Sequence, residues 1–400
     1  MFNKEWIQLE NERCAHNYHP LPVVLTKGEG VWLWDIEGKR YLDMMSAYSA
    51  ISFGHSHPKL VAVLKEQVER LCVVSRAFHA DTLLPFLEKL CSLCQLDMAL
   101  PMNTGVEAVE TALKAARRYG YEKKNIEDGK AEIIVANDNF HGRTISVISF
   151  STEKAYKKHF GPLTPGFVSI PFGDSEALKK AINKNTCAFL VEPIQGEAGI
   201  QIPPSGWLKE CERICKEENV LLILDEIQSG LGRSGKMFAY EHEGVKPDGL
   251  ILGKALGGGL LPVSAFLANK AVMEVFNPGS HGSTFGGNPL AARIGSAVLD
   301  LLNSEPIVEN SFKMGEVLQN ELKAIKHPLV KAVRGKGLWV GVEIDNSRVS
   351  ARAICHKMME LGVLAKETHE TVIRFAPPLI IEEQDLRFGI EQFTKALQSV

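Results

Sequence analysis

The sequence predicts an α/β protein whose main sheet is mostly parallel. Between about residues 100 and 270, short apolar runs of strand length alternate with amphipathic stretches of helical periodicity. The apolar runs end in turn residues, as the strands of βαβ units do. The predicted strands are Glu132–Ala136, Ala188–Val191, Leu221–Leu224 and Leu250–Leu252, and the helical stretches include Glu107–Arg118 and Leu208–Glu218.

The two ends of the chain differ from this middle part. Residues 31–35 and 39–43 resemble the strands of a β-hairpin. The last hundred residues mix a long helix, Ile307–Ile325, with strands near Leu338–Ile344 and Val372–Phe375. We expect a small α+β domain built from residues 1–48 and 296–400, and a large domain from residues 49–295.

Composition excludes several classes of protein. Acidic and basic residues are mixed along the 400-residue chain and the formal net charge is -3, so no surface for nucleic acid or an anionic membrane is indicated. No apolar run is long enough to cross a bilayer, and no secretory signal is visible. Cys91 and Cys94 form a CxxC motif, but no second pair completes a zinc site. We expect no metal, free thiols and a cytoplasmic location.

Asp225 ends the most apolar of the predicted strands. In a parallel sheet this position lies at the carboxyl edge, where ligands bind. A carboxylate there is costly to desolvate unless it meets a positive partner, and a protonated pyridine nitrogen is such a partner. A structural aspartate that caps the next segment is the alternative.

Lys254 follows the next predicted strand and precedes a run of glycines. Burial at this position would lower the pKa of the amine and supply the neutral form that condenses with an aldehyde. Alone, Lys254 could be an ordinary loop lysine. Together with Asp225 it predicts a site for pyridoxal phosphate (PLP), in which Lys254 forms a Schiff base and Asp225 keeps the ring nitrogen protonated.

Two further segments provide groups that suit PLP. The N–H groups of Thr104–Val106, which precede a predicted helix, could bind a phosphate, although an N-capped helix explains the same residues without a ligand. Phe140 could stack on a flat ring and Arg143 could clamp a carboxylate. Core packing of Phe140 and a surface position for Arg143 are the alternatives.

Two other motifs have simpler explanations. Gly230–Gly235 matches the GxGxxG of dinucleotide-binding folds, but other residues separate it from the preceding strand and no convincing helix follows. His55 and His57 could bind a metal, but no carboxylate or cysteine cluster completes such a site, and a turn before Pro58 is expected.

The whole chain resembles the class III (subgroup II) PLP-dependent aminotransferases of fold type I. The motifs around Asp225, Lys254 and Thr284 resemble the class as a whole. Those around Tyr18, Tyr48 and Arg374 resemble its members that act on L-ornithine. The resemblance implies a large domain with a mostly parallel seven-stranded sheet, a small α+β domain, and a homodimer with active sites shared between subunits. It is carried by residues 16–22, 46–50, 103–107, 139–144, 192–197, 224–228, 253–259, 281–289 and 373–378.

The resemblance also implies a reaction and a cofactor site. The δ-amino group of L-ornithine would pass to 2-oxoglutarate in a ping-pong mechanism, giving glutamate-5-semialdehyde, which cyclises to pyrroline-5-carboxylate, and glutamate. Such a reaction belongs to proline biosynthesis or arginine metabolism. The catalytic residues would be Lys254, which also shuttles the proton, and Asp225. The other cofactor contacts would be Gly105 and Val106 at the phosphate, Phe140 on the ring, Gln228 at the phenolic oxygen, and Ser283 and Thr284 from the other subunit.

Five residues would bind the substrates by the same resemblance. Tyr18 and Arg143 would hold the α-amino and α-carboxylate end of ornithine, and Tyr48 would shape the pocket. Arg374 would bind the α-carboxylate of glutamate or 2-oxoglutarate, and Glu197 would neutralise Arg374 through a bidentate pair while ornithine is bound.

His141 replaces a tryptophan that we associate with this position in some members of the class. We expect this change to alter the packing beside the PLP ring and to leave the charges of the site unaffected.

Other functions remain open from the sequence. Acetylornithine and 4-aminobutyrate aminotransferases belong to the same class, although the combination of Tyr18 and Tyr48 favours ornithine. An aminomutase of the same fold would need no 2-oxoglutarate. A non-catalytic PLP-fold protein would not need the intact set of Asp225, Gln228 and Lys254, and a nicotinamide oxidoreductase would depend on the GxGxxG match alone.

Overall fold

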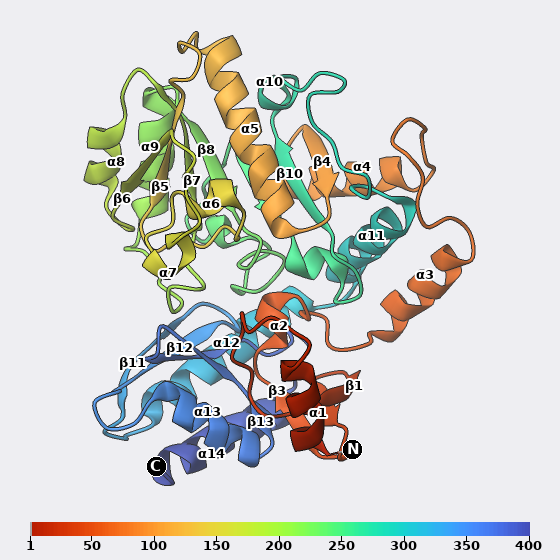
Figure 1. Cartoon of the computed structure of the whole chain (residues 1–400), viewed down its shortest axis with the longest axis vertical. Coiled ribbons are helices and arrows are strands. Elements are labelled where there is room, and N and C mark those ends of the chain that lie inside the picture. Colours follow the sequence, from red (N-terminus) through yellow and green to blue (C-terminus); the bar gives the residue numbers. More distant parts are fainter. Residues whose placement is uncertain (1) are drawn as a thin grey trace.

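A seven-stranded sheet forms the centre of the larger part of the molecule (Figure 1). In the computed structural model, which describes residues 2–400, β10 runs antiparallel to both of its neighbours. The pairs from β9 to β6 are all parallel, so the predicted sheet is confirmed. The strands in sheet order are β4 (Met98–Met102), β10 (Ser264–Ala268), β9 (Gly249–Leu252), β8 (Leu221–Asp225), β7 (Thr186–Val191), β5 (Glu132–Ala136) and β6 (Phe167–Ile170).

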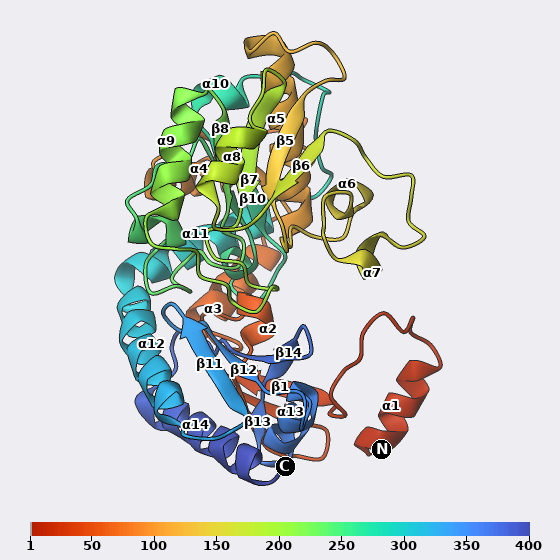
Figure 2. The ribbon, with the colours of Figure 1, turned by 90° about the vertical axis from the view of Figure 1, so that its left-hand side faces the viewer.

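Helices cover both faces of this sheet (Figure 2). Leu222 and Leu224 of β8 pack on one face with the side chains of α9 (Trp207–Glu217) and α8 (Ser175–Ala181). Leu221 and Ile223 pack on the other face with α5 (Gly105–Lys123). A strand that is buried on both faces has no polar side, which is why β8 and β9 are continuous apolar runs.

Further helices lie around the sheet, and two of them, α4 and α11, pack against each other. No helix within residues 2–400 combines the length and apolarity needed to cross a membrane. The remaining helices of this part and of the N-terminal segment are α1 (Asn3–Asn11), α2 (Ser46–Ser49), α3 (Pro58–Val68), α4 (Leu83–Cys94), α6 (Ile145–Ile148), α7 (Lys154–Lys157), α10 (Lys270–Met273), α11 (Pro289–Ser304) and the 3₁₀ helices η1 (Ala239–His242) and η2 (Lys254–Gly257).

The two chain ends meet in a second, smaller part of the molecule (Figure 1). The predicted hairpin is confirmed, because β2 and β3 pair antiparallel, and β3 also pairs with β13 from the C-terminal segment. The domain boundaries at residues 48 and 295 stay predictions, and the second of them falls within α11. One sheet has the order β1 (Leu25–Glu29), β2 (Trp32–Asp35), β3 (Arg40–Asp43), β13 (Val363–Leu364), and the other β11 (Val330–Gly335), β12 (Val340–Ile344), β15 (Val372–Phe375), β14 (Lys366–Thr368), with helices α12 (Ile307–Ala324), α13 (Ala351–Glu360) and α14 (Glu383–Gln398).

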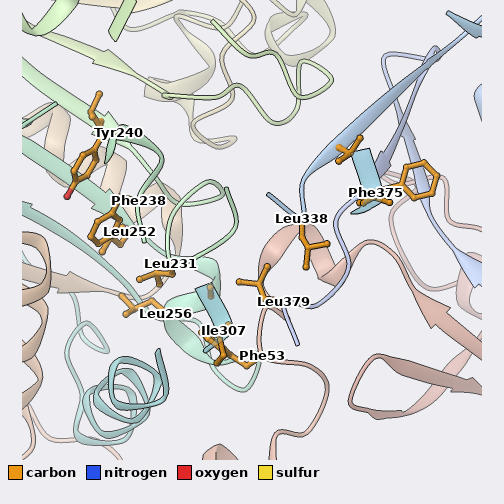
Figure 3. Close-up of a cluster of buried hydrophobic side chains, with 14 of the residues drawn as sticks. Phe53, Leu231, Phe238, Tyr240, Leu252, Leu256, Ile307, Leu338, Phe375 and Leu379 are labelled. Carbon is orange, nitrogen blue, oxygen red and sulfur yellow. The ribbon is translucent and has the colours of Figure 1, made fainter. Parts of the chain in front are cut away.

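One hydrophobic core joins the two parts (Figure 3). Leu252 and Leu256, which flank Lys254, belong to the same buried cluster as Leu338 and Phe375 of the C-terminal segment. Burial of apolar side chains across this junction contributes about 25 cal/mol per Å² removed from water. The core therefore fixes the position of β15 relative to the end of β9.

Arg233 lies at this junction, within the GxGxxG match. Its fully buried guanidinium donates hydrogen bonds to the carbonyl oxygens of Leu338 and Pro377 and to the hydroxyls of Ser46 and Ser52. Burial lowers the pKa of Arg233 to about 9. The turn at 230–235 leads into the short 3₁₀ helix η1 and not into the α-helix of a dinucleotide site, so it serves here as a structural junction.

We predict that Arg233→Met lowers the free energy of unfolding by about 3 kcal/mol or more, because it leaves four buried acceptors without their donor. The matched control is Arg213→Met, which removes an exposed arginine of α9 and should cost about 1 kcal/mol or less. Denaturant unfolding of both variants measures the difference. Equal free energies of unfolding for the two variants would contradict this account of the junction.

Candidate active site

The carboxyl ends of β8 and β9 border a cavity of about 200 Å³. Asp225 is the last residue of β8, and Lys254 comes two residues after β9. Because β8 and β9 pair in parallel, with Asp225 opposite Ile251, both side chains reach the same edge of the sheet. Six of the residues expected at the cofactor line this one cavity, namely Gly105, Val106, Phe140, Asp225, Gln228 and Lys254.

Two donors hold the Asp225 carboxylate, which is 4% exposed. The backbone N–H of Ile227 donates to Oδ1 over 3.0 Å, and Nδ1 of the buried His141 ring donates to Oδ2 over 2.6 Å. Burial works to lower the pKa of His141, but the hydrogen bond and charge of Asp225, with the charge of Glu192, raise it overall. The expectation that His141 leaves the charges of the site unaffected is therefore wrong.

Lys254 occupies a strained backbone position. Its φ is +45°, in the left-handed region that residues other than glycine seldom adopt. Such strain is common where a functional side chain must point in one direction. Burial lowers the pKa of Lys254, although the carboxylates of Glu197 and Asp225 oppose the change. A larger fraction of the amine is thus neutral than in an exposed lysine, and the neutral form is the nucleophile.

The first turn of α5 faces the cavity with Gly105 and Val106. Thr104 is the N-cap, and its own backbone N–H donates to Glu107 Oε2 over 2.7 Å. That N–H is thus already paired, so Gly105 and Val106 keep the helix N–H groups that can bind an anion. Close packing requires glycine at position 142, because a Cβ there would lie 2.7 Å from Val106 Cβ.

These groups fit PLP. The cavity joins an amine that can condense with the aldehyde, a carboxylate that can pair with the pyridinium, and a helix N-terminus for the phosphate. Gln228 is buried beside Asp225, and Phe140 presents a ring to the same space.

Glu192 also lines the cavity, although no role was predicted for it from the sequence. Its Oε2 accepts a hydrogen bond from the backbone N–H of Phe140 over 3.0 Å. Burial raises the pKa of Glu192 to about 7, with the charge of His141 acting in the opposite direction. Glu192 directly follows β7, so the strand-end rule that selected Asp225 would have selected it too.

Arg374, Glu197 and Tyr48 lie together. Arg374 Nη1 donates to Glu197 Oε1 over 2.6 Å. This is the one hydrogen bond between the two side chains, so the prediction of a bidentate pair is wrong. Burial works to raise the pKa of Glu197, but the charges of Arg374 and Lys254 lower it overall. The Arg374 guanidinium carbon lies 5.0 Å from the centre of the Tyr48 ring.

Arg143 and Tyr18 are not among the residues that line the cavity. The Arg143 guanidinium carbon lies 3.8 Å from the centre of the Tyr156 ring and 5.4 Å from that of Phe140, so it stacks beside the cavity. Tyr18 is 74% exposed in the segment after α1 and does not line the cavity.

Ser283 and Thr284 are also not brought to Lys254 within one chain. They line a separate surface hollow together with Ser75 and Arg76. Exposed apolar side chains flank this hollow in sequence, among them Phe78 and Phe285. The strand-end pattern that selected Asp225 and Lys254 does not connect this hollow with them, and only the family resemblance implies that Ser283 and Thr284 bind the same cofactor from the other subunit.

Comparison with known proteins agrees with this geometry. The family described as aminotransferase class-III matches residues 13–397. A curated ornithine aminotransferase of Geobacillus sp. (strain WCH70) is 58% identical over 99% of both chains. Among solved structures, an ornithine aminotransferase from Toxoplasma gondii with partial occupancy of PLP at its active site is 40% identical, with a TM-score of 0.98 over 100% of this chain and 95% of its own. An acetylornithine aminotransferase from Elizabethkingia anophelis is 45% identical, with a TM-score of 0.91 over 100% of both chains.

One assignment follows from the fold, from the cavity that Lys254 and Asp225 share, and from the family match over nearly the whole chain. The chain belongs to the class III aminotransferases, a PLP-dependent family.

Proposed function

We propose that this enzyme is an ornithine δ-aminotransferase that transfers the δ-amino group of L-ornithine to 2-oxoglutarate. The observation that carries the proposal is the pairing of Arg374 with Glu197 beside the Lys254 cavity. A site that binds a dicarboxylate needs a free arginine. The same arginine would attract the α-carboxylate of ornithine and place the α-amino group at the cofactor, so it must be neutralised while ornithine is bound. A pair that can open suits both requirements. The relatives that are named ornithine aminotransferases support the same substrate.

Each residue of the cavity has a separate role in the proposed reaction. PLP, when bound, supplies an aldehyde that accepts the amino group and a ring that stores the electrons of the broken C–H bond. Asp225 keeps the proton on the ring nitrogen, and His141 and the Ile227 N–H hold the Asp225 carboxylate in one orientation. Lys254 Nζ, released as a neutral amine, takes the proton from the δ-carbon of ornithine. Gly105 and Val106 bind the phosphate through backbone N–H groups.

The substrate residues set which amine reaches Lys254. Arg143 and Tyr18 bind the α-carboxylate and α-amino group of ornithine, and Tyr48 borders the chain of the substrate beside Arg374. Among the described residues, no carboxylate lies within ion-pair distance of Arg143, so its guanidinium remains available to a substrate carboxylate. Tyr18 is 74% exposed and does not line the cavity of a single subunit, so its contact with ornithine is part of the proposal.

We also propose a homodimer in which Ser283 and Thr284 of one subunit complete the phosphate site of the other. The surface hollow that these residues line, and the exposed apolar side chains of Phe78, Leu84 and Phe285, support such an interface. A cytoplasmic location is part of the proposal and is supported by the eight free cysteines.

An acetylornithine aminotransferase is the second candidate, because the Elizabethkingia anophelis structure of that name is 45% identical to this chain. The two functions differ in the group at the α-nitrogen. N-acetylornithine carries a bulky neutral amide where ornithine carries an ammonium. The two substrates therefore differ in the size and charge of the group that Tyr18 and Tyr48 would have to accommodate.

The proposal predicts that kcat/KM with 2-oxoglutarate is highest for L-ornithine among L-ornithine, N-acetylornithine and 4-aminobutyrate. Trapping the cyclic imine product with o-aminobenzaldehyde measures the ornithine reaction, and glutamate release measures all three. A higher kcat/KM for N-acetylornithine would assign the enzyme to the second candidate.

A second prediction concerns Glu197. Replacing Glu197 with Ala leaves Arg374 permanently free, so we expect the ratio of α-amino to δ-amino transfer from ornithine to rise about tenfold. Chromatography separates pyrroline-5-carboxylate, formed from the aldehyde product of δ-amino transfer, from the α-keto acid product of α-amino transfer, and so gives the ratio. Glu343→Ala is the matched control, because it breaks a glutamate–arginine pair of 2.7 Å with Arg334, which does not line the cavity. An unchanged ratio in Glu197→Ala would count against the gate.

A further inference from the structure

The segment before α5 and the loop before α11 form one hydrogen-bonded unit. The Asn103 side-chain amide donates to Glu107 Oε1 over 3.1 Å and to Ser283 Oγ over 2.9 Å. The backbone N–H of Gly286 donates to the same Ser283 oxygen over 3.0 Å. Both hydrogens of the Asn103 amide nitrogen are thus engaged, one on each segment.

This arrangement determines the direction of the Ser283 hydroxyl. A serine oxygen has two lone pairs and one hydrogen. The amide of Asn103 and the N–H of Gly286 occupy both lone pairs, so the hydrogen must point to a different acceptor. Ser283 lines the surface hollow with Thr284 and Arg76, where groups that donate to an anion are gathered.

The same unit also shapes the cavity of its own subunit. Glu107 Oε2 accepts hydrogen bonds from the backbone N–H groups of Asn103 and Thr104, which immediately precede Gly105 and Val106. Asn103 therefore connects the phosphate-binding turn of one site to the loop that carries Ser283.

We propose that Asn103 is a positioning residue that acts across the dimer, by keeping the Ser283 hydroxyl as a donor to the PLP phosphate bound in the partner subunit. The inference rests on the proposed sharing of active sites, and it adds a residue that contacts neither PLP nor substrate. Asn103 acts as a hydrogen-bond donor to Ser283 Oγ. An acceptor in its place would accept the hydrogen of the Ser283 hydroxyl, which could then no longer be donated to the phosphate.

The test uses Asn103→Asp, which keeps the shape of the side chain and replaces its donor with an acceptor. A hybrid dimer pairs a wild-type subunit with a subunit carrying both Lys254→Ala and Asn103→Asp. Only the wild-type subunit can bind PLP covalently, and its own Asn103 is intact. Any loss of PLP affinity at that site therefore comes from the altered subunit, across the dimer interface.

We expect the dissociation constant of lysine-bound PLP, followed by its visible absorption, to rise about tenfold relative to a hybrid that carries Lys254→Ala alone. Ser283→Ala in the same subunit should give a similar rise, and combining it with Asn103→Asp should add nothing further. Asn277→Asp, which adds a charge at an exposed position of the same loop, is the control and should cause no change.

Sedimentation of the hybrids separates the two proposals. In hybrids that sediment as dimers, a dissociation constant of PLP that is unchanged by Asn103→Asp but raised by Ser283→Ala would overturn the role of Asn103 alone. A dimer in which neither change has an effect would overturn the shared phosphate site, and a monomeric holoenzyme would overturn the dimer as well.

Discussion

The active site depends on one placement: the buried Asp225 carboxylate and the Lys254 amine face the same cavity at the edge of the large sheet. Parallel pairing of β8 with β9 produces this placement, because both strands end at one edge. A carboxylate at that depth needs compensation, and His141 and the Ile227 N–H supply part of it. The remainder suits a cationic ring between Asp225 and Lys254. Without this register, the residues of the family motif would not form a site.

The charges around the cavity are balanced in pairs. His141 hydrogen-bonds Asp225, and its charge also acts on the second buried acid, Glu192, whose pKa is raised to about 7 by burial. On the substrate side, Arg374 offsets Glu197 through a single hydrogen bond of 2.6 Å. One hydrogen bond is easier to break than a bidentate pair. The observed geometry therefore suits the proposed release of Arg374 when a dicarboxylate substrate binds.

Much of the large sheet could be predicted from local patterns, since β5 has the predicted bounds and β8 extends the predicted strand by one residue. The strand-end rule located Asp225 and could have located Glu192. Contacts between distant segments could not be predicted in this way. The pairing of His141 with Asp225 joins residues 84 positions apart, and it depends on how the loop after β5 returns to β8. The placement of Ser283 away from Lys254 depends on tertiary packing and, in the proposed function, on a second chain.

Reduction with borohydride tests the central placement most directly, because it makes the bond between PLP and its lysine permanent. After reduction of the holoenzyme, digestion and mass spectrometry, we expect the phosphopyridoxyl label on the peptide that contains Lys254. A label on any other lysine, or a holoenzyme with no reducible bond, would contradict the assignment of Lys254 and Asp225 to one cofactor.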